Sequence, residues 1–317
     1  MSVSTGQLAP SFTRPPSRVA VRRAENYQAD LPSLLFETLR EFDLPVRGKT
    51  VLLKPNFVGP DPLGVINTHP AVVGAAKESL LRLGAKEVMV GDGPALERDT
   101  EAILETMRLR DHIGPLASSF VDLNLEDVRR VPLRTRASRL KELYLPEAVL
   151  RADLVVSLPK LKTHHWAGVT LSLKNMFGIV PGGCYGWPKN ILHWSGITRS
   201  VLDINSTVRP DFAIVDGIMG MEGNGPIQGV PRPCGVLVLG NDPVAVDATC
   251  ARIMGLVPER IEHLAQASYL LGHLRDEKIQ QIGESIASVR TPFKVLPAFR
   301  RLRAAGEGRP WHSNCLA

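Results

Sequence analysis

Short apolar runs alternate with longer amphipathic segments in the first half of the chain, and this alternation restricts the fold more than any other feature. Residues 50–53 and 87–90 have the composition of buried strands, and apolar residues at helical spacing lie between them at 69–84. Pro70 suits the first turn of that helix and Gly84 its end. Strands joined by helices at this spacing form parallel sheets with right-handed connections. We therefore predict an α/β fold.

The same alternation resumes in the second half, where apolar runs at 154–158 and 213–215 resemble further strands. The 317 residues, of which 44% are hydrophobic, are enough for two cores of about 150 residues each. We therefore expect two Rossmann-like parallel-sheet α/β domains with a cleft between them. The expected units are a disordered lead at 1–17, an N-terminal α/β domain at 18–145, a C-terminal α/β domain at 146–290 and a basic tail at 291–317.

The composition disfavours several classes of protein. The net charge is +6, but only 5% of the residues are aromatic and none of the basic clusters is interleaved with them. A solvated basic face is therefore favoured over a nucleic-acid interface. No apolar run reaches the length of a membrane span, and the first residues lack the apolar core of a signal peptide. We expect a cytoplasmic protein without a membrane partner.

The four cysteines carry no metal-binding pattern. No Cys-x-x-Cys pair occurs among them, so the spacings of zinc ribbons and iron–sulfur clusters are absent. Cys250 lies in an apolar helical pattern typical of a core residue, and Cys184 lies in a Gly-rich loop at 181–188. We therefore expect reduced thiols and no cluster of the protein's own.

Polar side chains follow the predicted strands at the points where these end. In a parallel sheet the carboxyl ends of the strands lie at one edge, where ligands bind. A turn or helix-cap role is more common for any single one of them, so the prediction depends on their joint occurrence. These residues are Lys54, Asn56, Asp92, Lys160, Lys162, His164, His165, Asp216 and Asp242. The lysines among these residues predict a site for a small anionic molecule.

Three lysines and two histidines gather between residues 160 and 178. Thr170 and Lys174 are four residues apart, on one face of a predicted helix. A lysine on such an apolar helix either extends to solvent or is buried with a lowered pKa, and a buried lysine can act as a nucleophile, a base or an anion clamp. We predict His164, His165 and Lys174 as catalytic residues, and the sequence leaves open which histidine faces the site.

Other residues complete the predicted site. His69 precedes Pro70 at a helix start, where free N–H groups favour anions, although it is equally suited to cap that helix. Glu222 and Asn224 lie in a polar Gly-rich loop suited to a metal or a substrate hydroxyl. The residues predicted to bind substrate are Lys54, Asn56, His69, Asp92, Lys160, Lys162, Asn175, Asp216 and Asn224, and those predicted to bind metal are His193 and Glu222.

A string of short motifs resembles the domain-of-unknown-function family numbered 362. The motifs are Lys54–Pro55–Asn56, Thr68–His69–Pro70, Gly91–Asp92–Gly93–Pro94, the segments 158–164 and 170–178, the segment 215–226 and the segment 242–247. The resemblance implies little about activity, because the family is largely uncharacterised. Many members carry four-iron clusters, and this chain departs from them in lacking the cysteine run.

A second set of residues is similar to nickel-pincer lactate racemases. The segment 164–168, Lys174, the turn at 181–182 and His193 carry this resemblance. It implies that Lys174 holds a pyridinium cofactor covalently, that His164 or His165 acts as acid and base, and that His193 ligates nickel. This chain lacks the racemases' Thr-His-Arg segment and has an insertion between Lys174 and His193.

These features favour an enzyme that acts by proton or hydride transfer on a small carboxylate in an interdomain cleft. Such an enzyme is either an isomerase or racemase, or an oxidoreductase. The alternative is a non-catalytic protein that holds a metal, a cofactor or a maturation partner. The sequence leaves the substrate, the cofactor and the oligomeric state open.

Overall fold

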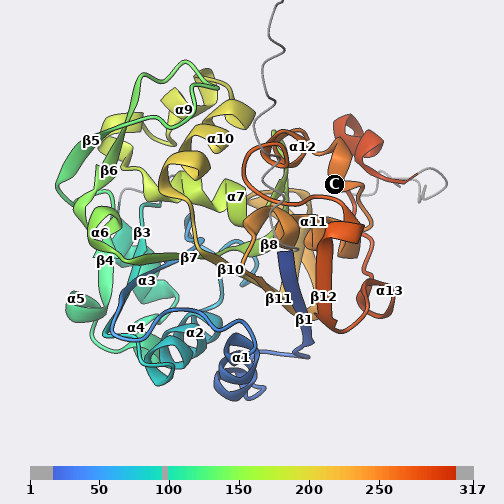
Figure 1. The fold of residues 1–317 in the computed structure, drawn as a ribbon, viewed down its shortest axis with the longest axis horizontal. Helices are drawn as coiled ribbons and strands as arrows, with labels where there is room; N and C mark the ends of the chain where they lie inside the picture. Colours follow the sequence, from blue (N-terminus) through green and yellow to red (C-terminus); the bar gives the residue numbers. More distant parts are fainter. Residues whose placement is uncertain (1–16, 95–98, 305–317) are drawn as a thin grey trace, which may run out of the picture.

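A computed structural model describes residues 17–94 and 99–304, and its centre is one large, mostly parallel sheet (Figure 1). Across the sheet the strands follow the order β12 (Ile279–Gly283), β1 (Ser17–Arg23), β11 (Gln228–Gly240), β10 (Phe212–Asn224), β7 (Leu154–Leu158), β2 (Thr50–Pro55), β3 (Glu87–Asp92) and β4 (Phe120–Asp122). The predicted α/β class is confirmed.

The strands from β10 to β4 pair in parallel, whereas β11 is antiparallel to both of its neighbours. Off the main order, β8 (Lys160–His164) pairs in parallel with β10 and antiparallel with β9 (Gly168–Thr170). Strand β7 lies between β10 and β2, and β1 lies between β12 and β11. Strands from 18–145 and from 146–290 therefore belong to one sheet, with β1 between two strands of the second half, and this sheet crosses the boundary expected between two domains.

Helices cover both faces of this sheet (Figure 1). Alternate residues of a strand point to opposite faces, so Val51 and Leu53 join one apolar core while Leu52 joins the other. The first core is covered by α1 (Leu31–Arg40), α2 (Pro70–Arg82), α3 (Thr100–Thr106), α4 (Arg110–Ile113) and α5 (Leu116–Ser119). The second is covered by α6 (Glu147–Arg151), α7 (Ser172–Asn175), α8 (Gly182–Tyr185), α9 (Asn190–Trp194), α10 (Ile197–Val208), α11 (Pro243–Ile253) and α12 (Glu262–Ala267).

Several segments differ from their sequence-based description. The polar run at 160–164, which follows the predicted strand at 154–158, is itself strand β8. Residues 190–208 form two helices, α9 and α10, because Gly196 takes a φ of 94° between them. The helix expected near 171–176 is the single turn α7, followed by a 3₁₀ turn at Met176–Ile179. Strand β12 had no apolar run strong enough to predict it.

The two ends of the chain lie partly outside the described residues. This holds for 1–16 of the expected lead and for 305–317 of the expected tail. The described part of that tail buries Phe293, Val295 and Leu302 against the second core. It also contains a 3₁₀ turn at Pro297–Leu302, while α13 (Ile286–Val289) precedes it. At the boundary expected between the two domains, β5 (Val128–Pro132) and β6 (Glu142–Pro146) form a separate hairpin.

Candidate functional site

A cavity of about 190 Å³ lies at the carboxyl ends of β2 and β3, where β8 and α7 close it. Most of the residues that the sequence predicts for a site line it. These are Lys54, Asn56, Asp92, Lys162, His164, His165, Lys174, Asn175 and His193. Residues from strands far apart in the sequence thus meet at one edge of the sheet, as the strand-end pattern led us to expect.

Lys54 and Asp92 form a fully buried ion pair in the wall of the cavity. The Nζ of Lys54 lies 2.6 Å from Oδ1 of Asp92 and also donates to Pro55 O and to Asn175 Oδ1. The other carboxylate oxygen of Asp92 accepts from the backbone N of Phe57 at 2.6 Å. All three donors of the Lys54 ammonium are therefore used, and Lys54 acts on a ligand through its charge rather than through a direct hydrogen bond.

Gly178 permits this ion pair. A Cβ atom at position 178 would collide with Asp92 Oδ1 and with Nζ of Lys54. Burial lowers the pKa of Lys54 and raises that of Asp92, and each charge counters the shift of the other. The Lys174–Asn175–Gly178 spacing in the sequence therefore has a structural reason besides any catalytic one.

Lys174 is held at the cavity by the short helix α7. The carboxylate of Asp247, from α11, accepts from the backbone N of Ser172 at 2.8 Å, from the Ser172 hydroxyl and from the backbone N of Leu173 at 3.0 Å. These bonds satisfy free donors at the start of the helix. Burial raises the pKa of Asp247 to about 7, which these three donors oppose. Asp247 is thus a positioning residue for Lys174.

The amine of Lys174 has no hydrogen bond or ion pair with any other described residue. Its Nζ lies 3.8 Å from the centre of the Phe177 ring, and the residue is 9% exposed. Burial, together with the charge of Lys54, lowers the pKa of Lys174 to about 7. A large fraction of the amine is therefore neutral near pH 7 and faces a cavity.

Lys162, on β8, is the second cation that remains available to a ligand. Its Nζ donates to Ile66 O at 2.6 Å and to Pro226 O at 3.4 Å, which leaves one N–H of an ammonium. Burial lowers the pKa of Lys162 to about 7, and the charge of Asp61 opposes this. The cavity therefore gains positive charge readily when an anion enters it.

The three imidazoles of the cavity are in different hydrogen-bonding states. Nδ1 of His164 accepts from the backbone N of Trp166 at 3.0 Å and of Ala167 at 3.2 Å, so the ring proton of neutral His164 is on Nε2. In His165 and His193 the ring proton is instead on Nδ1. Their Nδ1–H groups donate to carbonyl oxygens, of Gly225 at 2.9 Å and of Lys189 at 3.1 Å, which leaves each Nε2 with a free lone pair.

Burial and nearby cations keep two of these imidazoles neutral. The pKa of His193 is lowered to about 4, first by burial and then by Lys174. Burial and the charge of Lys174 hold the pKa of His164 well below its usual range. His164 and His165 both line the cavity. The sequence left open which of the two faces the site. In the structure both do, and His164 offers an N–H donor whereas His165 offers a lone-pair acceptor.

Two further polar atoms of the cavity wall are buried without a partner. They are Oδ1 of Asn56 and Oγ1 of Thr170. Most buried side-chain polar atoms in proteins are hydrogen-bonded, so exceptions at a cavity indicate a place for a polar ligand or water. Thr170 was noted in the sequence only for its spacing from Lys174.

Two functional features were not predicted from the sequence. Lys189 is fully buried, and its Nζ donates to Gly93 O at 2.7 Å, to Phe177 O at 3.2 Å and to Val180 O at 2.5 Å. It thereby fixes the start of helix α9, which carries His193. Trp166 is 58% exposed, and its ring is 5.0 Å from that of His193. Trp166 directly follows His165 and was detectable, whereas the contacts of Lys189 depend on tertiary structure alone.

Three predicted residues form a second buried cluster that does not line the cavity. Nζ of Lys160 lies 2.9 Å from Asp216 Oδ2 and donates to the hydroxyl of Tyr27 at 2.8 Å. Asp216 also accepts from the backbone N of His69 at 3.0 Å. The His69 ring stacks on that of Tyr27 at 3.7 Å, and its Nδ1 caps α2 by accepting from Ala71 N.

Glu222 and Asn224 lie near the end of the β10–β11 hairpin, and neither lines the cavity. Glu222 accepts from the backbone N of Lys294 at 2.9 Å, and Asn224 donates to Gln228. Within residues 17–94 and 99–304, no group of three or more His, Cys, Asp or Glu side chains is arranged to hold a metal ion. His193 and Glu222 were predicted as metal ligands, and only His193 is at the cavity.

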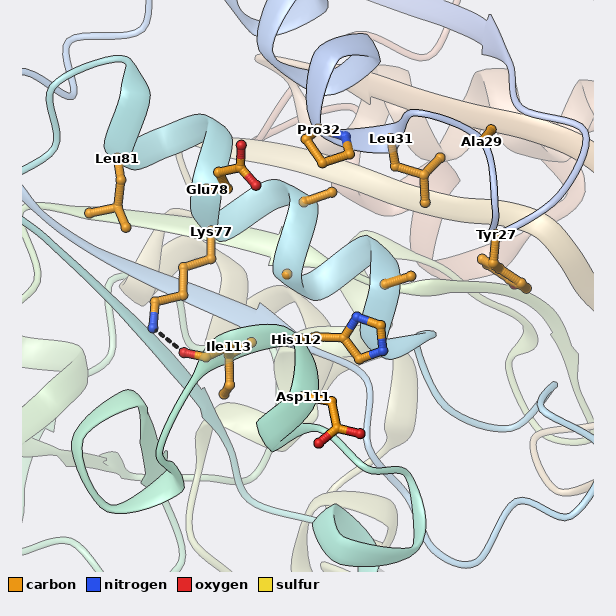
Figure 2. A pocket seen from close by; sticks show the side chains of 13 residues that line it. Tyr27, Ala29, Leu31, Pro32, Lys77, Glu78, Leu81, Asp111, His112 and Ile113 are labelled. Atoms are coloured by element: carbon orange, nitrogen blue, oxygen red, sulfur yellow. Dashed lines mark hydrogen bonds between the residues drawn. The ribbon is translucent and has the colours of Figure 1, made fainter.

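A wider pocket of about 480 Å³ opens between α1, α2 and α4, with Tyr27 at one end (Figure 2). Its charged groups have partners within the protein. Lys77 donates to Ile113 O at 2.8 Å, and Asp111 pairs with Arg108 at 2.7 Å. None of the predicted site residues lines this pocket. The smaller cavity, with its uncommitted amine and imidazoles, is therefore the candidate site.

Comparison with known proteins agrees with the motif string. The thylakoid-associated protein sll1697 of Synechocystis sp. is 31% identical over 263 residues, which cover 78% of this chain and 77% of that protein. None of the described helices meets the length and apolarity needed to cross a membrane.

Two solved structures are also similar. The lactate racemase apoprotein from Thermoanaerobacterium thermosaccharolyticum has a TM-score of 0.44 and 13% identity, over 76% of this chain and 57% of that one. A protein from Thermotoga maritima has a TM-score of 0.44 and 14% identity, over 72% and 59%. This chain thus spans less than two thirds of the length of either. The model of the domain of unknown function DUF362 matches residues 51–252, and the chain therefore belongs to that family, as the motifs predicted.

Proposed function

We propose that this protein is an enzyme that moves a proton to or from a carbon atom of a small carboxylate bound in the cavity. The observation that carries the proposal is the Lys174 amine, which has no partner among the described residues and shares a cavity with two imidazoles whose Nε2 lone pairs are free. General bases and charge-stabilising groups in one cavity are the elements of such a reaction.

The carboxylate of the substrate is held by Lys162 and Thr170. Lys162 has one N–H left after its two carbonyl contacts, and the Thr170 hydroxyl is buried without a partner. The positive charge of Lys54 also attracts the carboxylate, but Lys54 makes no hydrogen bond to it, because all three of its donors are used within the protein. A charge in a site of low dielectric constant acts more strongly than it does in water, so two cations are enough to bind one carboxylate.

His165 or His193 takes the proton from carbon. Each has its Nδ1–H fixed by a backbone carbonyl, and the free Nε2 of each is a base of the right kind. Lys174 stabilises the negative charge that develops when the proton leaves. With a base on either side of the bound carbon, the return of the proton inverts a stereocentre, and with a single base it moves a double bond.

A nickel-pincer cofactor is a second candidate, favoured by the same two residues. Its attachment needs a neutral lysine amine, which Lys174 offers, and its metal needs an imidazole lone pair, which His193 offers. Lys174 would hold the pyridinium group and His193 the nickel, and the group would supply hydride acceptance. Intact mass and nickel content of protein from its native host test this candidate directly.

Hydrogen exchange at carbon tests the proposed function. We expect the wild-type protein to exchange a C–H hydrogen of one or more small carboxylates for deuterium in D₂O, observed by proton NMR. Lys174→Met and the double variant His165→Gln/His193→Gln should lose this exchange by at least about 100-fold, the scale of general acid–base catalysis. Lys77→Met, which alters a lysine outside the cavity, is the matched control and should retain it.

Two outcomes oppose the proposal. Exchange that persists in both cavity variants would place the reaction elsewhere. Carboxylates that raise the melting temperature of the wild-type protein but never exchange would favour the non-catalytic, ligand-holding alternative.

A further inference from the structure

Five lysines are buried in the described part of the chain, and Lys174 differs from the other four. Each of the others donates to at least two oxygen atoms. They are Lys54, Lys160, Lys162 and Lys189. Lys174 has only the face of Phe177 beside its nitrogen. The Lys174 amine opens on the cavity, so its hydrogen-bonding capacity is left for a ligand or water, whereas the protein itself satisfies the other four.

We propose that Lys174 is a nucleophile that forms an imine with a ketone or aldehyde carbon of the substrate, which makes the substrate an oxo acid. The inference rests on the proposed function and names the substrate class of the same cavity. In place of stabilising a nearby negative charge from a distance, Lys174 bonds to the carbon next to the one that loses its proton.

The position of Lys174 suits this role. Its helix is fixed at its start by three hydrogen bonds to Asp247, and Asn175, the next residue, is tied to Lys54 O and to Ser157. The amine therefore projects into the cavity from a rigid support, where no carboxylate contacts it. Burial and the cation of Lys54 lower its pKa to about 7, so the nucleophilic form is present at neutral pH.

The covalent step balances without any further reactant. The Nζ lone pair of Lys174 adds to the carbonyl carbon, a C–N bond forms, and the carbonyl oxygen leaves as water after proton transfers. One additional proton, taken from solvent, gives the cationic iminium form. The carboxylate of the oxo acid stays on Lys162 and Thr170, which have the unused donors.

The iminium then acidifies the adjacent C–H bond. Its proton passes to Nε2 of His165 or His193, the electron pair of that C–H bond forms a carbon–carbon double bond, and the π pair of the iminium moves to nitrogen, which gives an enamine. Return of a proton and hydrolysis by water release the oxo acid and the free Lys174. No oxidant or reductant is consumed, and the net result is the carbon–hydrogen exchange described above.

Reductive trapping tests the imine. The full-length protein is incubated with pyruvate and sodium cyanoborohydride at pH 7.5, and the modified lysine is located by peptide mass spectrometry. We expect one added carboxyethyl group per chain, on Lys174, at least tenfold above any other lysine. Propionate, which has the carboxylate but no carbonyl, should add no mass.

Two variants keep the test informative. Lys174→Met should lose the adduct, and its circular dichroism and melting curve show whether it folds. Lys174→Arg retains a cation without the nucleophile and should also lose the adduct, whereas Lys77→Met should keep it. An adduct spread over several lysines, or unchanged in Lys174→Met, would overturn the inference.

The outcome also separates this inference from the proposed function. Carboxylate hydrogen exchange without a trapped adduct on Lys174, with pyruvate or 2-oxobutyrate as probe, would remove the imine and leave the proton-transfer enzyme. A trapped adduct at Lys174 without exchange at carbon would support the nucleophile and contradict the proposed reaction.

Discussion

Two buried lysine–aspartate pairs join neighbouring parallel strands in this protein, and only one of them lines the cavity. Lys54 and Asp92 are 2.6 Å apart, and Lys160 and Asp216 are 2.9 Å apart, with all four side chains almost fully buried. In both pairs the aspartate also accepts from backbone N–H groups. The first pair faces Lys174 across the cavity, whereas the second is closed over by Tyr27.

The comparison shows that a charged pair at a strand end is not in itself a functional site. Around Lys160 every charge is matched, and the hydroxyl of Tyr27 takes the donor that a ligand would otherwise use. Around Lys54 the pair is equally complete, but a third, unmatched amine is its neighbour. The cavity therefore differs from the Lys160 cluster in having an amine without a partner, that of Lys174, next to its complete ion pair.

The largest expected effect is the loss of stability when either pair is broken. Asp92→Asn and Asp216→Asn should each lower the free energy of unfolding by about 3–5 kcal/mol, because each leaves a buried lysine charge unmatched. Urea denaturation at pH 7 measures this. Glu37→Gln, at an exposed ion pair with Arg40, is the control and should change stability by less than about 1 kcal/mol. A large loss of stability for only one of the two variants would contradict the view that the two ion pairs are equally complete.

A second prediction is that replacing a buried lysine by methionine changes the free energy of unfolding in opposite directions in the two regions. Lys174→Met should raise the free energy of unfolding at pH 7 by about 1–3 kcal/mol, since a tenfold change in proton affinity is about 1.4 kcal/mol and burial disfavours this charge. Lys160→Met should lower it by about 3–5 kcal/mol, because Asp216 would remain buried without its lysine. Functional sites are commonly destabilised in this way. A destabilised Lys174→Met protein would show that the amine has a structural role.

Much of the fold follows from the sequence, because local patterns and global structure agree there. Helix α2 begins at Pro70 and ends just before Gly84, and the apolar runs at 50–53 and 87–90 are paired parallel strands. Strand β8 was missed because its buried residues include Lys160, Lys162 and His164, so its burial does not appear as an apolar run. The single sheet was missed because strand order depends on long-range pairing that no local pattern carries.

The site follows from the sequence only in part. Lys54 and Asp92 meet as their strand-end positions predict, and Lys174 joins them from the short helix α7. Lys160 and Lys162 are two residues apart on one strand, yet they reach different surroundings, because the pairing of β8 with β10 shifts register between Asp216 and Met221. Such an irregularity cannot be read from residue types. Glu222 was predicted from its Gly-rich loop, and that loop is the end of a hairpin whose Pro226 and Ile227, but not Glu222, line the cavity.

A third prediction concerns pH and the lysines on the cavity side. Lys162, Lys174 and Lys189 have pKa values lowered to about 7, against about 10.4 in an unfolded chain. Between these values the unfolded chain binds more protons, so the free energy of unfolding should rise with pH, by at most about 1.4 kcal/mol per pH unit for each lysine. Below pH 7 these three lysines are charged in both states and add no slope.

Denaturation of the wild-type protein at several pH values from 7 to 10 measures that slope. Lys174→Met should reduce the slope of the free energy of unfolding against pH by at most the contribution of one lysine. The reason is that the variant lacks one group that becomes protonated on unfolding. Lys86→Met, at an exposed position, should leave the slope unchanged. Equal slopes in all three proteins would mean that Lys174 keeps an ordinary proton affinity in the fold.

The smallest expected effect is the uptake of protons when a carboxylate binds. An anion in the cavity stabilises the charged forms of Lys162 and Lys174, so their pKa values rise from about 7 on binding. Propionate is the suitable probe, because it lacks the carbonyl that would consume the amine. Titration calorimetry at pH 8 in two buffers of different ionisation enthalpy should show uptake, at most about one proton per lysine. At pH 5.5 the uptake should vanish, since both lysines are already charged, and Lys174→Met should show a smaller uptake at pH 8. A heat that is independent of the buffer at pH 8 would mean that the carboxylate does not bind beside these lysines, and the difference between the cavity and the closed Lys160 cluster would then have to be sought in another ligand.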